Sequence, residues 1–144
     1  MHPNQYYPLI QTDDVAGTAK FYQRHFNFKP MFESDWYVHL QSCTEPNVNL
    51  AVLEHDHETI PAEARGTTRG MILTFEVDDV DAEDARLRGE GVPVVYSLKS
   101  EEHGQRHAIY RDPNGIMIDV ITPIPPSDEF AAGYSDEALP TQLL

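Results

Sequence analysis

One carboxylate stands in an otherwise apolar stretch near the end of the chain. Residues 116–121 read IMIDVI, so Asp119 has aliphatic neighbours on both sides. A carboxylate in such surroundings is costly unless a metal ion, a cation or a hydrogen-bond donor compensates its charge. Asp119 is therefore a candidate metal ligand or an anchor for a cationic ligand. The structural alternative is a hydrogen bond from Tyr7 or an ion pair with Arg106 or Arg111.

Histidine is the commonest metal-binding side chain, and the chain contains 7 histidines. His39 in WYVHLQ and His107 in GQRHAIY lie on expected strands, and a relocated metal site could combine them with Asp119. His55 and His57 fall where an expected strand meets a linker, away from that site. The interpretation that we favour is that His39 and His107 are half-buried strand residues with hydrogen-bond partners.

The elements that position these residues form a repeat. The segments YYPLIQTDDVAGTAKFYQRHFNF and GMILTFEVDDVDAEDARLRGEGV align on their Asp-Asp-Val triplets, residues 13–15 and 78–80, with an offset of 65 residues. In each segment an alternating strand leads into the triplet. An Asp there is suited to cap the free N–H groups of a following helix. The sequence therefore predicts the same strand–helix unit twice.

The two predicted helices differ in their apolar stripes. In the second helix Val80 and Leu87 keep the stripe, but Asp84 interrupts it. Gly91 ends this helix in the left-handed conformation, and Asn27 is expected to do the same after the first helix. The first helix carries one continuous stripe, with spacings of 4, 3 and 4 residues: Val15, Ala19, Tyr22 and Phe26.

Three short strand signals follow each helix. They are KPMFE, WYVHLQS and VNLAVLE in the first half, and VPVVYSL, RHAIYR and IMIDVIT in the second. The sequence DPNG at 112–115 predicts a hairpin turn between the last two strands. We therefore expect an α+β fold of two tandem βαβββ modules, in which each helix covers one face of a four-stranded sheet.

The predicted boundaries follow from these elements. Between the modules, HDHETIPAEARGTTRG is polar and aperiodic, and the C-terminal segment is rich in Pro and acidic residues, with a short docked turn around Phe130 and Tyr134. The expected organisation is a single domain over residues 1–124, containing module 1 at about 5–55, a linker at 56–69 and module 2 at about 70–124, followed by a tail at 125–144.

The charge of the chain narrows its expected partners. With 10 basic and 24 acidic residues the formal net charge is −14, which disfavours nucleic acid and favours cationic small molecules. No apolar run is long enough to cross a membrane, and the N-terminus does not resemble a signal peptide. Cys43 is the only cysteine, so no disulfide forms within the chain. We expect a cytoplasmic protein that does not bind membranes.

The sequence resembles the vicinal-oxygen-chelate superfamily, which includes glyoxalase I, extradiol dioxygenases, fosfomycin-resistance transferases and bleomycin-resistance proteins. The resemblance rests on TDDVAGTAKFYQRHFNF, FEVDDVDAEDARLRGEGVPV and GQRHAIYRDPNGIMIDVI, in this order, and covers nearly all of residues 5–124. It implies that the curved sheets of the two modules enclose a cleft. It also implies a two-fold homodimer, for which the edge strands in MFESDWYVHL and PVVYSL offer an interface.

The resemblance further implies where a metal ion would be held. Metal enzymes of this superfamily place a ligand, usually His, seven residues before the helix-opening Asp of each module, which gives Tyr7 and Ile72 here. A further ligand, usually Glu, lies on the last strand of one or both modules, at positions that hold Ala51 and Asp119. Because alanine and isoleucine cannot bind a metal ion, we expect that the inherited metal site has been lost and that the chain has no cofactor.

Strand alternation assigns side chains to the expected cleft. The cavity should be mostly apolar, with few polar groups, as is typical of a small-molecule site. Either Trp36 or Tyr37, which are adjacent, can point inward, and Glu76 should lie near the rim. The predicted ligand-binding residues are Tyr7, Leu9, Gln11, Trp36, Asn49, Leu53, Ile72, Thr74, His107, Met117 and Asp119.

Three functions are compatible with this pattern. The first is a protein similar to bleomycin-resistance proteins, which binds a small amphipathic or cationic molecule without a metal ion or a catalytic residue. The second is an enzyme of the superfamily, a glyoxalase-like lyase, an isomerase or a dioxygenase, with a displaced metal site or with Tyr7 and Asp119 as an acid–base pair. The third is a structural subunit whose cleft is filled by its own side chains.

Overall fold

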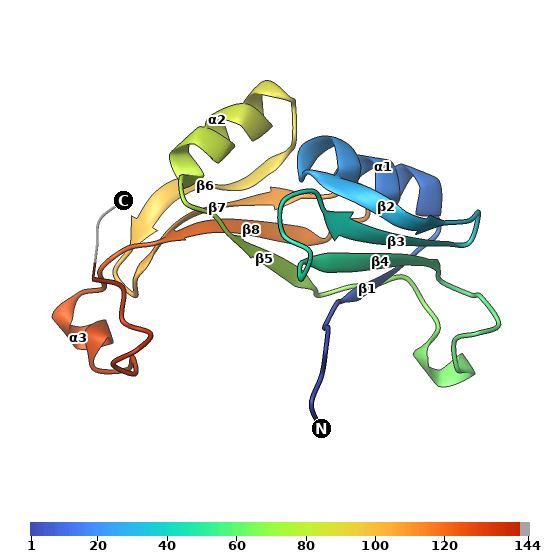
Figure 1. The fold of residues 1–144 in the computed structure, drawn as a ribbon. Helices are drawn as coiled ribbons and strands as arrows, with labels where there is room; N and C mark the ends of the chain where they lie inside the picture. The colour runs from blue at the N-terminus through green and yellow to red at the C-terminus, as the bar shows by residue number, and fades with distance from the viewer. Residues whose placement is uncertain (142–144) are drawn as a thin grey trace. The chain divides into compact units, whose positions relative to one another are not determined.

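The computed structural model describes residues 1–141 of the chain. Among these residues, no helix is long and apolar enough to span a membrane. The elements, labelled in Figure 1, are β1 (Leu9–Thr12), α1 (Val15–His25), β2 (Phe28–Glu33), β3 (Tyr37–Ser42), β4 (Asn49–Glu54), the 3-10 helix η1 (Ala62–Ala64), β5 (Ile72–Glu76), α2 (Val80–Gly89), β6 (Val94–Glu101), β7 (Gln105–Arg111), β8 (Met117–Pro123) and α3 (Asp128–Ala131).

The chain divides into two compact units that repeat one topology. Unit 1 contains residues 1–70 and 113–115, and unit 2 contains 71–112 and the residues from 116 onward. The strand order is β1-β4-β3-β2 in unit 1 and β5-β8-β7-β6 in unit 2. In each sheet the first strand is parallel to its neighbour, and the other pairs are antiparallel. The predicted fold class, α+β with two βαβββ modules, is confirmed.

Both long helices begin as the sequence predicts. The side chain of Asp14 accepts a hydrogen bond from the Gly17 amide, and that of Asp79 accepts one from the Ala82 amide. Asn27, with a φ of 56°, and Gly91, with a φ of 79°, adopt the expected left-handed conformation after the two helices. The same capping chemistry therefore starts α1 and α2.

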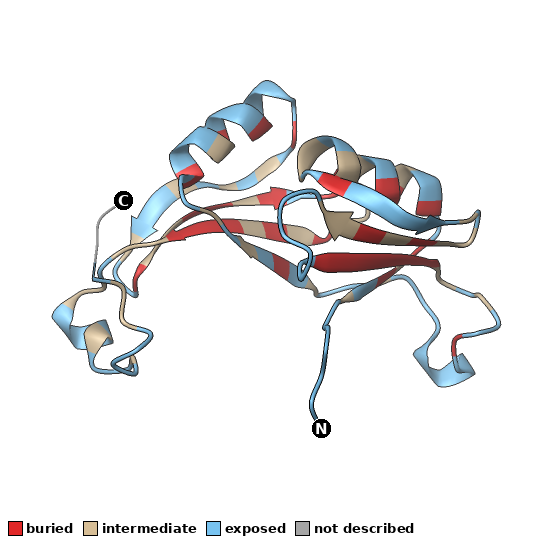
Figure 2. Ribbon diagram, in the orientation of Figure 1, coloured by how far each residue is buried: buried red, intermediate tan, exposed pale blue. Residues whose placement is uncertain are grey.

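Each helix covers one face of its own sheet, and the core lies between them. In unit 1, Val15, Ala19 and Tyr22 of α1 are buried as predicted, whereas Phe26 is the C-cap residue and is only half-buried. β4, with five buried residues, and β8, with four, contain more buried residues than any other strand of their sheets (Figure 2). These central strands therefore provide the sheet side of both cores.

The DPNG turn joins β7 to β8, as predicted. Asp112 stabilises this turn, because its carboxylate accepts a hydrogen bond from the Ile116 amide at 2.9 Å. The turn also belongs to the packing of unit 1: the Thr12 hydroxyl donates to Asn114 Oδ1 at 2.7 Å, and Asn114 Nδ2 donates to the Thr18 hydroxyl at 2.9 Å. Asn114 thus links the end of β1 to α1.

The start of the C-terminal tail packs on the β6–β7 hairpin of unit 2. The Ser127 amide donates to the Glu102 carbonyl at 2.8 Å, and the Tyr134 hydroxyl donates to the His103 carbonyl at 2.6 Å. The docked turn around Phe130 and Tyr134 is therefore present. The predicted tail reaches residue 144, and its positions 142–144 lie outside the described residues.

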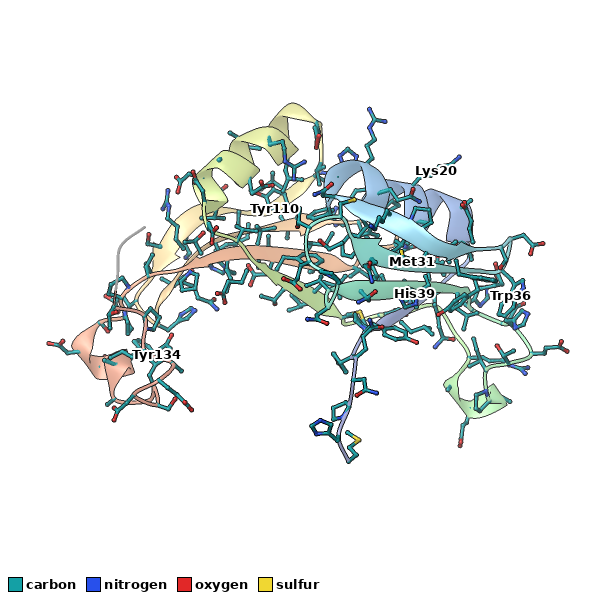
Figure 3. The ribbon with its side chains drawn as sticks, viewed as in Figure 1. Lys20, Met31, Trp36, His39, Tyr110 and Tyr134 are labelled. Carbon is teal, nitrogen blue, oxygen red and sulfur yellow. The ribbon has the colours of Figure 1, made fainter. Side chains whose placement is uncertain are left out.

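Asp84 interrupts the apolar stripe of α2, as the sequence indicates, but it still packs in the core. It is buried with Val80 and Leu87. Its carboxylate accepts a hydrogen bond from the Tyr110 hydroxyl of β7 and pairs with Arg88 at 3.0 Å. Tyr110, labelled in Figure 3, is itself fully buried, and burial together with this hydrogen bond raises its pKa above the usual range. A buried carboxylate with two partners can replace an aliphatic side chain here.

This contact predicts a non-additive effect on stability. Asp84→Ala should lower the free energy of unfolding by about 1–3 kcal/mol, because the Tyr110 hydroxyl loses its acceptor while buried. Tyr110→Phe should cost about 1 kcal/mol, since Asp84 keeps Arg88. The double variant should lose less than the sum, as measured by urea denaturation of all four proteins. Strict additivity would show that the two side chains do not depend on each other.

Candidate functional site

Each sheet has a second face that its helix does not cover, here called the helix-free face of that unit. Strand register defines its members, because alternate residues point to the same side. In unit 1 these are Leu9, Gln11, Tyr37, His39, Gln41, Asn49, Ala51 and Leu53. In unit 2 they are Ile72, Thr74, Glu76, Gln105, His107, Ile109, Arg111, Met117, Asp119 and Ile121.

The helix-free face of unit 1 is held by hydrogen bonds that involve no carboxylate. His39 Nε2 lies 3.0 Å from Asn49 Oδ1, and Asn49 Nδ2 donates to the Pro46 carbonyl at 2.9 Å. Tyr7, which precedes β1, packs against His39 in a T-shaped arrangement, with 4.8 Å between the two ring centroids. Burial raises the pKa of Tyr37, and Tyr7 beside it adds to the shift. His39 is therefore a half-buried strand histidine with a partner, as the sequence predicts.

The helix-free face of unit 2 carries a charged cluster, here called the His107 network, which consists of Tyr96, Lys99, Glu101, His107 and Asp119. His107 Nδ1 lies 2.8 Å from Asp119 Oδ1, and His107 Nε2 lies 3.2 Å from Glu101 Oε1. The same Glu101 oxygen accepts from the Tyr96 hydroxyl at 3.1 Å and pairs with Lys99 at 3.2 Å. His107 can donate to both carboxylates only when both of its ring nitrogens carry protons.

These contacts identify the residue that compensates Asp119. Its partner is His107, not Tyr7, Arg106 or Arg111. Arg106 instead pairs with Asp81 of α2 at 2.8 Å. The side chains of Asp119 and His107 are 15% and 10% exposed, so the pair is largely shielded from water.

Sequence reasoning missed the β6 members of the network. Strict alternation along β6 would put Tyr96 on the face opposite Lys99 and Glu101. Two register shifts, between Val94 and Tyr96 and between Tyr96 and Lys99, bring the three side chains to one face. The expected strand also stopped at Leu98, whereas β6 continues to Glu101. A bulge leaves no periodic signal in the sequence. The available hint was that Lys99 and Glu101 are two residues apart, a spacing that places both on one face of a strand.

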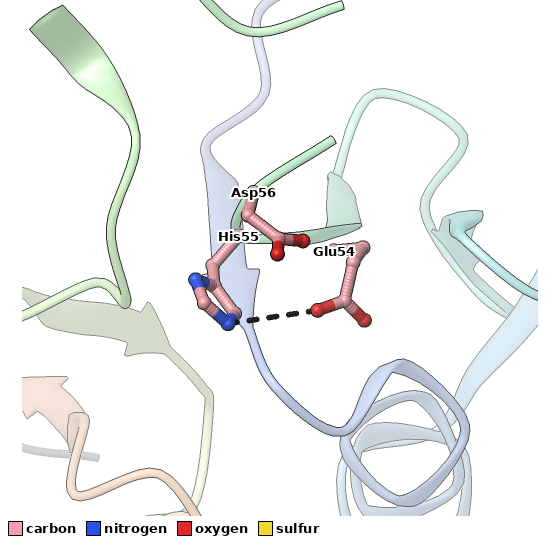
Figure 4. Close-up of side chains that lie close together, drawn as sticks. All are labelled: Glu54, His55 and Asp56. Carbon is pink, nitrogen blue, oxygen red and sulfur yellow. Dashed lines mark ion pairs between the residues drawn. The ribbon is translucent and has the colours of Figure 1, made fainter. Parts of the chain in front are cut away.

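The His107 network is not arranged as a metal chelate. Its two carboxylates lie at opposite nitrogens of one imidazole ring, so the three groups cannot converge on a single ion. Within residues 1–141, the ligand atoms of one group of three such side chains do converge, within 4.8 Å of one another: Glu54, His55 and Asp56 (Figure 4). His55 Nε2 and Glu54 Oε1 are 3.6 Å apart. Imidazole and carboxylate ligands suit zinc or manganese. Glu54 is the last residue of β4, and His55 and Asp56 form the turn that follows it, so this group lies outside the His107 network.

Trp36 does not lie on the helix-free face of unit 1. It precedes β3, and its ring stacks on His57 with a centroid distance of 3.8 Å and an interplanar angle of 5°. Of the two adjacent aromatic residues, Tyr37 is the one that shares the face with His39. Figure 3 labels Trp36 at the end of the strands and His39 on them.

The other predicted ligand residues lie on or beside the two helix-free faces, each within its own unit. Thr74 is opposite Asp119 in the β5–β8 register, and Ile72 is opposite Met117. Glu76, expected at a rim, is exposed. The residues on the unit 1 side are Tyr7, Leu9, Gln11, Asn49 and Leu53, and those on the unit 2 side are Ile72, Thr74, His107, Met117 and Asp119.

Comparison with known proteins agrees with this topology. A sequence profile of the Glyoxalase/Bleomycin resistance protein/Dioxygenase superfamily matches residues 5–120. The chain belongs to this superfamily. A search of curated proteins finds no match.

Solved structures share the fold at low sequence identity. Lactoylglutathione lyase from Agrobacterium tumefaciens is 18% identical with a TM-score of 0.67, over 83% of this chain and 94% of that one. TioX from Micromonospora sp. ML1 is 18% identical with a TM-score of 0.69, over 85% and 100%. A glyoxalase-related enzyme from Fulvimarina pelagi is 19% identical with a TM-score of 0.66, over 83% and 88%. At these identities the similarity concerns the fold alone.

The residues at the superfamily's metal-ligand positions do not fit a metal ion. Ala51 and Ile72 have no donor atom, and Ile72 is 60% exposed. Tyr7 contacts His39 through its ring, and Asp119 uses one oxygen for His107. Apart from the Tyr7 hydroxyl, an uncommon ligand for such ions, one carboxylate remains where a chelate would need two or three donors.

The His107 network predicts how stability depends on pH. Hydrogen bonds from His107 and then Lys99 lower the pKa of Glu101 to about 2. A carboxyl whose pKa is depressed on folding stabilises the protein above its usual pKa, and this contribution is lost as the pH falls from about 4.5 to about 2. Glu101→Gln should therefore lose less stability than the wild type between pH 6 and pH 3, measured by urea denaturation.

The neighbouring residue provides the control. Glu102 is exposed, and its carboxylate is not part of the network. Glu102→Gln should show the wild-type decrease in stability between the two pH values. An equal decrease in Glu101→Gln and the wild type would mean that the network does not hold the Glu101 carboxylate in its ionised form.

Proposed function

We propose that this chain is a binding protein for a small amphipathic molecule with a cationic group, and that it acts without a metal ion. The observation that carries the proposal is the state of Asp119. The carboxylate at the superfamily's ligand position is held by His107 through Oδ1, and two of the three positions that would complete a metal site, Ala51 and Ile72, hold apolar side chains. A group held in this way is suited to anchoring a ligand rather than to chelation.

The surroundings of Asp119 support a cationic, partly apolar ligand. Asp119 Oδ2 has no partner among the described residues, and neither has the exposed carboxylate of Glu76 on the neighbouring strand. Ile72 and Met117 provide apolar surface on the same face. A net charge of −14 also raises the local concentration of cations. An ammonium group near Asp119 with its apolar part over Ile72 would use all three features.

The enzyme alternative has weaker support. The lyase among the structural relatives contributes the fold only, since it is 18% identical. Lyase and dioxygenase chemistry in this superfamily depends on a metal ion that polarises substrate oxygens or activates oxygen. The donor set at Tyr7, Ala51, Ile72 and Asp119 does not supply that ion with ligands.

The binding proposal predicts charge-dependent recognition at Asp119. Phenethylammonium should shift the NMR signals of Ile72, Thr74 and Met117, and 2-phenylethanol, its uncharged analogue, should bind at least tenfold more weakly, as expected when about 1.4 kcal/mol of ionic attraction is lost. Glu76→Gln and Asp119→Asn should each weaken the binding of phenethylammonium and leave the affinity for 2-phenylethanol unchanged. Glu76 is exposed and makes no hydrogen bond or ion pair with the described residues, so Glu76→Gln tests the same charge effect should Asp119→Asn fail to fold.

A matched control uses the opposite face of the same sheet. Asp81→Asn removes one carboxylate beside Arg106 and should leave phenethylammonium binding within about twofold of the wild type. If Asp81→Asn weakened phenethylammonium binding as much as Asp119→Asn does, the effect would come from the net charge of the protein alone. The proposal would be contradicted if phenethylammonium caused no saturable NMR shift of the residues on the helix-free face of unit 2.

The metal-free part of the proposal has its own test. Protein purified without chelator should contain far less than one metal ion per chain. Any rise in melting temperature with nickel, zinc, manganese or ferrous iron should be the same in the wild type and in Asp119→Asn. One tightly held ion that is lost in this variant would instead favour the enzyme.

We also propose that the protein is a cytoplasmic homodimer, as expected from the sequence. The edge strands β2 and β6 support this, because Met31, Phe32 and Val95 are exposed on them by 56%, 54% and 44%. Sedimentation equilibrium should give twice the chain mass, and Phe32→Glu should lower it to one chain if β2 forms the interface. The matched substitution Val95→Glu tests β6 in the same way.

A further inference from the structure

A second candidate site lies in unit 1, outside the helix-free faces. It is a hollow of about 350 Å³, here called the Arg69 hollow, between the end of the linker and the DPNG turn. None of its residues belongs to the predicted ligand set. The lining consists of Thr67, Thr68, Arg69, Gly70, Asn114 and Gly115.

The walls of the Arg69 hollow are fixed by hydrogen bonds to β1. Thr68 is paired with Gln11, whose amide donates to the Thr68 hydroxyl at 2.8 Å and whose carbonyl accepts from the Thr68 amide at 2.9 Å. Asn114 is held by Thr12 and Thr18. The two segments that form the hollow are therefore both anchored on β1, and the DPNG turn is also anchored on α1, so hydrogen bonds within unit 1 fix the shape of the hollow.

Two side-chain donors of the hollow are not used by the described part of the protein. The guanidinium of Arg69 and the hydroxyl of Thr67 make no hydrogen bond or ion pair with the described residues. Gly70 and Gly115 have φ values of 68° and 85°, and no heavy atom lies within 4 Å of where a Cβ would be. A ligand can thus approach the backbone at both glycines.

The charge of the lining selects the ligand. Arg69 is the only charged residue among the six, in a chain that has 24 acidic and 10 basic residues. A hollow without a carboxylate in so acidic a protein disfavours a cation. The planar guanidinium instead matches a carboxylate or a phosphate group, and hydroxyl and backbone N–H donors strengthen such contacts.

We propose that the Arg69 hollow binds a small oxyanion, a phosphate or carboxylate group carried by a small molecule. Arg69 forms the ion pair, the Thr67 hydroxyl donates a hydrogen bond, and the backbone near Gly70 and Gly115 lines the approach. Asn114 and Thr68 hold the walls and keep their own partners. The site is independent of the ligand proposed for the face of Asp119.

NMR titration with inorganic phosphate and, separately, with acetate tests this inference, at an ionic strength held constant with sodium chloride. The amide signals of Thr67, Gly70 and Gly115 should shift saturably with at least one of the two probes. Phosphate alone would indicate a phosphoryl ligand, and acetate alone a carboxylate ligand. Arg69→Gln should weaken binding at least tenfold, and Thr67→Val should weaken it severalfold, since charged hydrogen bonds contribute more than neutral ones.

Arg24→Gln is the matched control. Arg24 is an exposed arginine in the last turn of α1, so this variant has the same change in net charge within the same unit. It should bind the probe within about twofold of the wild type. Shifts that sodium chloride alone reproduces, shifts equal in Arg69→Gln and the wild type, or no shift with either probe would each overturn the inference. Melting temperatures of the variants identify any loss of folding.

Discussion

Each sheet is covered by one helix only, and the rest of the structure follows from that constraint. A four-stranded sheet has two faces, and α1, with 11 residues, or α2, with 10, packs against one of them. The apolar residues of alternate strand positions therefore gather on the helix side. Polar groups on the other face must find partners among themselves, because an unpaired polar group that is shielded from water is costly.

The two units meet this constraint with different chemistry on equivalent positions. In unit 1 the register joins Leu9, Ala51 and His39, and in unit 2 the matching row is Thr74, Asp119 and Ile109. The carboxylate thus has an aliphatic residue directly opposite it. Its partner has to come from the diagonal position two residues along β7, which is His107, and diagonal neighbours are within reach of long side chains.

The repeat, the helix caps and the hairpin turn could be predicted from the sequence, because each depends on residues close together in the chain. Asp14 and Asp79 act on the amides three residues later, and Asn27 and Gly91 act through their own backbone conformation. The His107 network and the Tyr110–Asp84 contact could not be predicted in this way. Both depend on contacts between different strands and helices, and the first also depends on shifts of register in β6. Asp119 was recognised as needing a partner, but its partner was not.

The different solutions in the two units also explain why the proposed ligand site is on the helix-free face of unit 2 and not on that of unit 1. In unit 1 the Asn49 side chain is engaged on both sides, by His39 and by the Pro46 carbonyl, so binding a ligand there would break hydrogen bonds that folding has made. In unit 2 the network engages only one oxygen of Asp119 and does not include Glu76. A ligand cation can therefore add to the charge balance without displacing His107. Asp119 is stabilised in the folded chain and still retains an acceptor for a ligand.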